Sequence, residues 1–208
     1  LLIDPKGLVE MSLVEDKDII VGESGESQVD YLGVKNYKHR ILKSAFLNYH
    51  LNQNEGLIND FEGYCKEESY WLEDYAVYAA IKSLNNDLPW FEWKESLRNK
   101  EEVAINEFVL GHKDQLEFEK FQQFLFAKQW TALHEYSKSK GVQIVGDIPI
   151  YVAHDSSDVW SRIENFDLKS NGEPNMIAGV PPDYFSETGQ LWGNPTYDWA
   201  FLESTGFE

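Results

Sequence analysis

Cysteine is nearly absent from this chain, since Cys65 is the only one among 208 residues. An intrachain disulfide is therefore excluded, which is typical of proteins from a reducing cytosol. The sequence also lacks a run of about 18 apolar residues, so it predicts no membrane span. Its first residues, LLIDPKGLVEM, have neither the basic region nor the apolar region of a signal peptide. We expect a cytoplasmic protein that does not bind membranes.

Positive charge is also scarce, because 18 Lys and Arg face 36 Asp and Glu, giving a formal net charge of −18. Such a surface repels phosphate backbones, and no basic stripe compensates for it, so nucleic acids are not expected as partners. No phosphate-binding glycine motif of the GxxxxGK[ST] or GxGxxG type occurs. Neutral or cationic ligands remain, and no cofactor is expected.

Hydrophobic periodicity predicts that the first 137 residues are mostly helical. Apolar residues recur at three- and four-residue spacing in three stretches. These stretches are Leu32–Leu51, Ser69–Asn85 and Gln115–Tyr136. The third is so apolar that we expect it to be buried on most sides. Gly141 follows its last basic residues and predicts the helix end.

After Gly141 the pattern changes to a short apolar run, VQIVGDIPI, at 142–150. A buried helix that leads into a buried strand predicts one α→β unit of an α/β protein, either a doubly wound sheet or a barrel. Asp147 lies at the end of this predicted strand, where α/β enzymes place polar site groups. An Asp that caps the next turn explains the position equally well.

The stretch from Gly141 to Trp199 is unusually rich in aromatic residues and carboxylates. Flat aromatic faces beside carboxylates and amides suit a neutral, polyhydroxylated ligand such as a sugar. Pro181 and Pro182 stiffen one loop, and glycines at 189 and 193 permit tight turns. The alternative is that these aromatic loops simply pack on the core.

Two acidic clusters in this region could suggest a cation site. The first, Asp155-Ser156-Ser157-Asp158, is better interpreted as a helix N-cap. The second, Asp167 to Ala178, lacks oxygen ligands where an EF-hand loop needs them. We therefore predict no metal site. Asn171-Gly172 predicts a hairpin with a type I′ turn.

Two segments, GDIPIYVAHDSSDVW and AGVPPDYFSETGQLWGNPTYDW, strongly resemble the amylomaltase family of 4-α-glucanotransferases, part of the wider α-amylase clan. Further similar segments are WLEDYAVYAAIK, PWFEW and FEKFQQFLFAKQW, so the resemblance runs essentially from end to end. It implies an α/β fold, namely an incomplete piece of a (β/α)8 TIM barrel with a large helical insertion. The chain itself would be mostly α, with 1–137 as the helical insertion and 138–208 as a barrel strand plus active-site loops.

The resemblance also implies a retaining transfer of α-1,4-glucan segments between maltooligosaccharides or starch-like glucans. Asp147 would line the donor site, and a mobile loop would close over the glucan. The implied substrate-binding residues are Asp147, Asp183, Tyr184, Phe185, Gln190, Trp192 and Asn194. The family carries its catalytic carboxylates in motifs that resemble R-I-D-H-F-R and G-E-D-L-G, and neither occurs here.

No catalytic residue is therefore expected in this chain, which resembles an inactive internal piece of a longer enzyme. A noncatalytic glucan-binding module is the alternative function. A structural or interaction domain is a further alternative, in which the aromatic loops are core. Because a barrel piece leaves strand edges unpaired, self-association is also expected.

Overall fold

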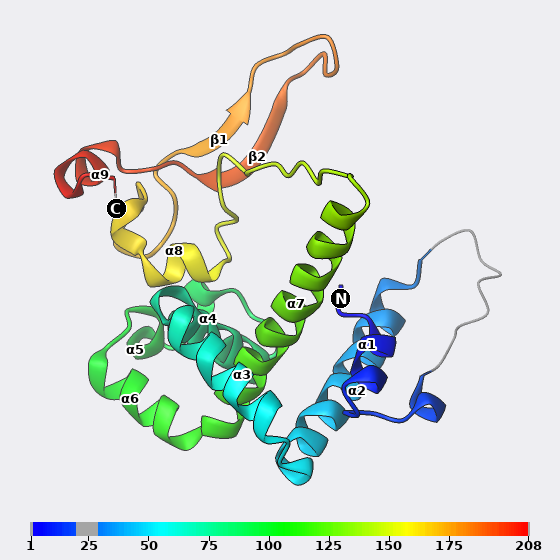
Figure 1. Cartoon of the computed structure of the whole chain (residues 1–208). Coiled ribbons are helices and arrows are strands. Elements are labelled where there is room, and N and C mark those ends of the chain that lie inside the picture. The colour runs from blue at the N-terminus through cyan, green and yellow to red at the C-terminus, as the bar shows by residue number, and fades with distance from the viewer. Residues whose placement is uncertain (1, 20–28, 208) are drawn as a thin grey trace. The chain divides into compact units, whose positions relative to one another are not determined.

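In the computed structural model, which describes residues 2–19 and 29–207, the chain is mostly helical (Figure 1). The larger helices are α2 (Tyr31–Asn52), α3 (Glu55–Glu67), α4 (Ser69–Leu84), α6 (Glu102–Gly111) and α7 (Lys113–Ser139). The shorter elements are α1 (Pro5–Glu10), η1 (Asp16–Asp18), η2 (Trp90–Glu92), α5 (Glu95–Arg98), α8 (Ser157–Ser161), η3 (Ile163–Asn165) and α9 (Trp199–Thr205). The strands are β1 (Ile177–Val180) and β2 (Gln190–Pro195).

The chain forms two compact units, each assembled from two separate stretches of sequence. Unit 1 contains the described residues of 1–72 and 117–145, and unit 2 contains those of 73–116 and 146–207. Two boundaries between the units fall inside α4 and α7, and the third falls in the segment after α7. The sequence-based division into a helical insertion (1–137) and a barrel strand with active-site loops (138–208) refers to parts of a complete barrel enzyme. It stays a prediction.

The core of unit 1 is built from rings on α2, α3 and α7. Phe121 on α7 is fully buried, and its ring lies 4.9 Å from that of Tyr49 and 5.7 Å from that of Phe61. Local capping starts the helices that present these rings. The Asn54 side chain accepts a hydrogen bond from the Leu57 amide to cap α3.

The core of unit 2 is built around three tryptophans from two segments, namely η2 with its C-cap residue and α8. Trp90, Trp93 and Trp160 are nearly or fully buried, and the rings of Trp93 and Trp160 lie 5.7 Å apart. Their indole N–H groups are satisfied, since Trp93 donates to the Leu88 carbonyl and Trp160 to the Leu97 carbonyl. The Trp90 indole N–H donates to the His154 carbonyl and so holds the loop segment that leads to α8.

The three long helices predicted from periodicity are confirmed as α2, α4 and α7. The predicted end of α7 is also confirmed, because Gly141 has a φ of 71°. There the Val142 amide donates to the Ser137 carbonyl and the Gly141 amide to the Lys138 carbonyl, which forms a Schellman motif.

The expectation that α7 is buried on most sides is wrong for its second half. Phe121 and Leu125 are buried, but Trp130, Leu133 and Tyr136 are exposed. The buried apolar partners that α2 and α3 supply lie against the first half of the helix. The second half therefore carries an apolar face that these residues leave open.

The strand predicted at 142–150 is not formed among the described residues. This segment runs extended but unpaired, and Val145 and Ile148 are 90% and 85% exposed. A strand needs a neighbour to accept and donate its backbone hydrogen bonds. The described ladder, β1 with β2, lies elsewhere and is antiparallel. Asp147 is therefore not at the end of a parallel strand in this structure.

The hairpin predicted at 166–174 is present only as a short turn. An isolated bridge joins Leu168 to Pro174, and the Gly172 amide donates to the Lys169 carbonyl. A type I′ turn requires positive φ at both central residues. Gly172 has a φ of 84°, but Asn171 is not among the residues with positive φ, so the predicted turn type is wrong.

Candidate functional site

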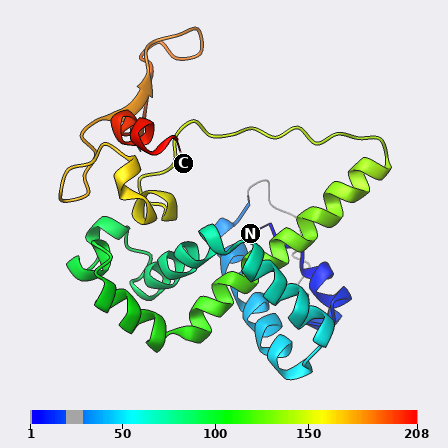
Figure 2. The same cartoon turned by 60° about the vertical axis from the view of Figure 1, so that its left-hand side comes forward.

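The candidate site is the β1–β2 hairpin of unit 2, which Figures 1 and 2 show in orange as a projecting ribbon. Gly179 pairs with Leu191, and Val180 with Gln190. Glycine is required at 179, because a Cβ there would lie 2.6 Å from the Gln190 carbonyl oxygen. The close pairing holds the loop 181–189 at the far end of the hairpin.

Asp183 braces the tip of this loop through its own carboxylate. One oxygen accepts hydrogen bonds from the amides of Phe185 (2.9 Å) and Ser186 (2.8 Å). The Ser186 hydroxyl donates to the Gly189 carbonyl at 2.7 Å, and Gly189 has a φ of 74°. Asx-type bonding of this kind fixes a turn without a hydrophobic core.

The braced tip presents two aromatic rings to solvent. Tyr184 is 98% exposed and Phe185 is 89% exposed, and their rings are 5.6 Å apart and nearly perpendicular. Trp192 on β2 is 44% exposed, and its indole N–H donates to the Gln190 side-chain oxygen at 3.0 Å. Gln190 thereby orients the indole.

Five of the seven predicted site residues thus lie on the hairpin with exposed rings or polar groups, whereas Asn194 and Asp147 differ. The Asn194 side-chain amide donates to the Val152 carbonyl at 2.7 Å, so it is engaged with the protein. Asp147 is exposed in the extended segment and accepts from the adjacent Ile148 amide at 2.8 Å. The structure does not place Asp147 in contact with the hairpin residues described here.

Asp155, which the sequence placed in a helix N-cap, has a different role in the structure. Its carboxylate accepts from the Tyr78 hydroxyl at 2.8 Å and from the Trp90 amide at 3.3 Å, and it forms an ion pair with Lys82. The helix cap expected here is provided by Ser156, whose hydroxyl accepts from the Val159 amide. The partners of Asp155 are 65 to 77 residues away, so no local signal reveals them.

The same contacts shift two pKa values. Burial opposes ionisation of Asp155, but hydrogen bonds from Lys82 and Tyr78 outweigh it and hold the pKa of this carboxyl below its ordinary value. Burial, followed by the hydrogen bond to Asp155, raises the pKa of Tyr78 well above its usual range. Asp155 is therefore ionised and Tyr78 protonated at neutral pH.

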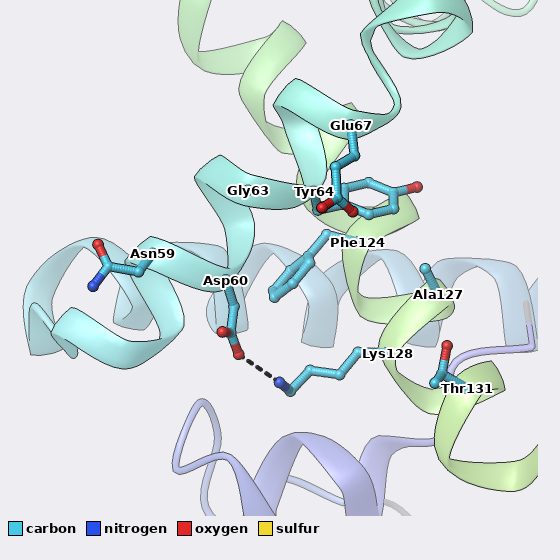
Figure 3. Close-up of a pocket in the computed structure, with 9 residues that line it drawn as sticks. All are labelled: Asn59, Asp60, Gly63, Tyr64, Glu67, Phe124, Ala127, Lys128 and Thr131. Atoms are coloured by element: carbon cyan, nitrogen blue, oxygen red, sulfur yellow. Dashed lines mark hydrogen bonds and ion pairs between the residues drawn. The ribbon is translucent and has the colours of Figure 1, made fainter. Parts of the chain in front are cut away.

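Unit 1 contains a separate open groove between α3 and α7, with a volume of about 430 Å³ (Figure 3). Its lining residues are Asn59, Asp60, Gly63, Tyr64, Glu67, Phe124, Ala127, Lys128 and Thr131. The figure shows the Phe124 ring between the two helices, while Lys128 and Asp60 form an ion pair at 2.7 Å. These two charges therefore satisfy each other.

Across residues 2–19 and 29–207, no three His, Cys, Asp or Glu side chains come close enough together to hold a metal ion. None of the helices described for this chain is both long and apolar enough to cross a membrane. The chemistry that the site presents is therefore that of aromatic faces, amides and carboxylates.

The comparisons with known proteins agree on one family over essentially the whole length of the chain. The family model Glyco_hydro_77, described as 4-alpha-glucanotransferase, matches residues 1–208. The 4-alpha-glucanotransferases of Aquifex aeolicus and Thermus thermophilus are 43% and 41% identical over 206 residues, which is 99% of this chain and 41% of each relative. The chain thus spans about two fifths of these relatives.

Among solved structures, an amylomaltase from Streptococcus agalactiae in complex with acarbose aligns with a TM-score of 0.91 and 34% identity. The alignment covers 100% of this chain and 42% of that protein.

Proposed function

The chain belongs to the 4-alpha-glucanotransferase family, and we propose that it contributes the glucan-binding hairpin of an enzyme that transfers α-1,4-glucan segments between maltooligosaccharides. The observation that carries this proposal is the exposure of Tyr184, Phe185 and Trp192 on a braced hairpin. Rings that were merely part of a core would be buried. Instead they face solvent beside Gln190 and Asp183, as a sugar-stacking surface requires.

The proposed roles follow the positions of the side chains. Trp192, oriented by Gln190, stacks on a glucose ring, and Tyr184 with Phe185 closes over the glucan from the loop tip. Asp147 lines the donor site from the extended segment. Asn194 completes the set, although in this structure its amide is bonded to Val152.

We further propose that the chain is an internal piece of a (β/α)8 barrel, with 1–137 as a helical insertion and 138–208 as a barrel strand with its active-site loops. Two exposed apolar stretches that follow each other in the chain support this, the second half of α7 and the segment 142–150. Large exposed apolar patches mark surfaces that bind other protein elements. A neighbouring strand would give the segment 142–150 the backbone partners that it lacks here.

In this proposal the reaction is a retaining double displacement. An aspartate attacks the anomeric carbon while a glutamic acid about 5 Å away protonates the leaving oxygen, and both lie outside this chain. The 4-hydroxyl of an incoming glucan then takes the glycosyl group from the enzyme. Closure of the aromatic loop excludes water and so disfavours hydrolysis. No cofactor enters the chemistry.

The cellular location and self-association of the chain belong to the proposal as well. One cysteine and the acidic composition favour the cytoplasm. The unpaired segment 142–150 favours self-association through its open backbone groups, which light scattering at increasing protein concentration would detect.

The test is to mix the 208-residue chain with maltoheptaose and with maltotriose, and to follow binding and product formation separately. We expect NMR shift changes at the Trp192 indole N–H on addition of maltoheptaose, and no ladder of longer and shorter oligomers from maltotriose. A ladder would contradict the placement of the catalytic carboxylates outside the chain. Binding without turnover by a naturally complete 208-residue protein would favour the noncatalytic module.

A further inference from the structure

We propose that residues 150–155 form a strap that holds the β1–β2 hairpin in place, and that Asp155 is the positioning residue that anchors this strap. The inference deepens the function proposed above and rests on it for the role of Trp192 in sugar binding. The strap itself is defined by contacts within unit 2 that need no ligand. The strap explains how the β1–β2 hairpin, most of whose side chains are exposed, keeps its orientation in unit 2.

On one side, the strap is bonded to the hairpin. The Asn194 side-chain amide, at the end of β2, donates to the Val152 carbonyl at 2.7 Å. The Tyr197 hydroxyl, just after β2, donates to the Ile150 carbonyl at 3.0 Å. Two side chains of the hairpin strand and its continuation thus hold alternate backbone carbonyls of the strap.

On its other side, the strap is anchored to α4 and η2 through Asp155. One carboxylate oxygen accepts from Tyr78 and from the Trp90 amide, and the other pairs with Lys82. Each oxygen therefore has a partner on the protein, and Asp155 contacts no part of the hairpin surface described above. Its effect on a bound glucan would have to pass through the strap.

His154 adds a second attachment beside the first. Its backbone carbonyl accepts from the Trp90 indole N–H at 2.7 Å, and its Nε2 lies 2.7 Å from the Gly172 carbonyl. The imidazole stacks on Phe91, with centroids 4.6 Å apart and planes 6° from parallel. These contacts give His154 a structural role.

The strap lies between the two parts of the proposed site along the chain. Asp147 precedes it by three residues, and Trp192 is two residues before Asn194. A change at Asp155 should therefore move the hairpin without touching Trp192. A residue that merely stabilised α4 would have no such selective effect.

The experiment is hydrogen–deuterium exchange, read by mass spectrometry, on the 208-residue chain and on Asp155→Asn. The substitution keeps the shape but turns an amide toward the Lys82 ammonium, which then lacks an acceptor. We expect exchange of residues 150–155 and 190–197 to accelerate by about tenfold, while residues 41–49 of α2 are unchanged. Ser156→Ala is the matched control, because it removes only the cap of α8 and should affect residues 157–161.

Tyr78→Phe provides a second variant in case Asp155→Asn does not fold, since it keeps the ring and loses one hydrogen bond. It should accelerate the same two segments by a smaller factor. The proposal is overturned if residues 190–197 exchange as in the unaltered chain while 150–155 accelerate. An equal acceleration across 73–84 also overturns it, because that result is general destabilisation.

A second measurement separates this inference from the proposed function. Maltoheptaose affinity of Asp155→Asn, from the NMR shift of the Trp192 indole, should fall by about tenfold although every proposed sugar contact is intact. If the unaltered chain binds no maltoheptaose but the exchange result holds, the glucan-binding role of the chain fails and the strap stands. If the unaltered chain binds maltoheptaose but the exchange result fails, the glucan-binding role stands and the strap proposal fails.

Discussion

The side-chain amide of Asn194 donates a 2.7 Å hydrogen bond to the carbonyl of Val152, 42 residues earlier in the chain. This bond joins the end of the hairpin to a segment that has no regular secondary structure. Side-chain bonds to loop carbonyls hold irregular backbone where no ladder exists. Asn194 therefore has a structural role in addition to its proposed role in binding sugar.

Replacing Asn194 by Ala tests this task. We expect the free energy of unfolding to fall by about 1 to 2 kcal/mol, because the half-buried Val152 carbonyl loses its donor. Urea unfolding followed by tryptophan fluorescence measures the change. Asn59→Ala on the exposed surface of α3 is the control and should stay within about 0.5 kcal/mol of the unaltered chain. Equal stability of the two variants would contradict the assignment.

Trp192→Ala tests the proposed stacking face in the complete enzyme. We expect glucan transfer to fall by about tenfold or more, because the proposed stacking face for a glucose ring is lost. Trp192→Phe keeps an aromatic face and should retain most of the activity. Oligosaccharide products from maltotriose give the rates. Near-normal kinetics of Trp192→Ala would reject the stacking role.

Gly189→Ala tests the shape of the hairpin tip. A Cβ at this position would lie 2.4 Å from the Val180 carbonyl oxygen, on a backbone with a φ of 74°. We expect the tip to rearrange, with loss of about 1 to 3 kcal/mol and weaker maltoheptaose binding. The matched control is Gly63→Ala, where the new Cβ has no atom within 4 Å.

Because Gly63 lies inside α3, its replacement by Ala should leave glucan binding unchanged and raise stability by about 0.5 to 1 kcal/mol. Thermal unfolding and maltoheptaose titration compare the two variants. If Gly189→Ala binds as well as Gly63→Ala, the tip does not need its present shape.

The lowered pKa of Asp155 predicts how stability changes in acid. The folded state favours the ionised carboxylate, so this contribution is fully present above the ordinary aspartate pKa of about 3.9. It is lost as the pH falls through the still lower folded-state value. Urea unfolding from pH 7 to pH 3 should therefore show Asp155→Asn less stable at pH 7 and converging with the unaltered chain in acid. A constant difference would contradict the ion pair.

Local signals predicted the helices well, because spacing and caps act within a few residues. The end of α7 at Gly141 needed only a glycine able to adopt positive φ. The strand predicted at 142–150 is not formed for the opposite reason, since a buried strand depends on neighbouring strands that its own sequence does not contain. Asp155 was interpreted as part of a cap because its partners Tyr78 and Lys82 are distant in the chain.

The candidate site was found from composition and family resemblance, and not from geometry. Aromatic residues among prolines and glycines indicated the loop at 181–189, and the structure exposes its rings. Which rings would be exposed could not be read from the sequence, because Trp160 in the same region is buried at 2% exposure. The difference arises from Leu97 and Trp93, which the fold brings to Trp160.

Two neighbouring aromatic residues at an exposed loop tip have a practical consequence. Chymotrypsin accepts aromatic side chains in its specificity pocket, and exposed tips are where proteases cut first. Tyr184 and Phe185 should therefore be early cleavage points, and a sugar laid across them should slow the cut. Chymotrypsin cleavage at the hairpin tip, followed by gel electrophoresis, would therefore report sugar binding without a label.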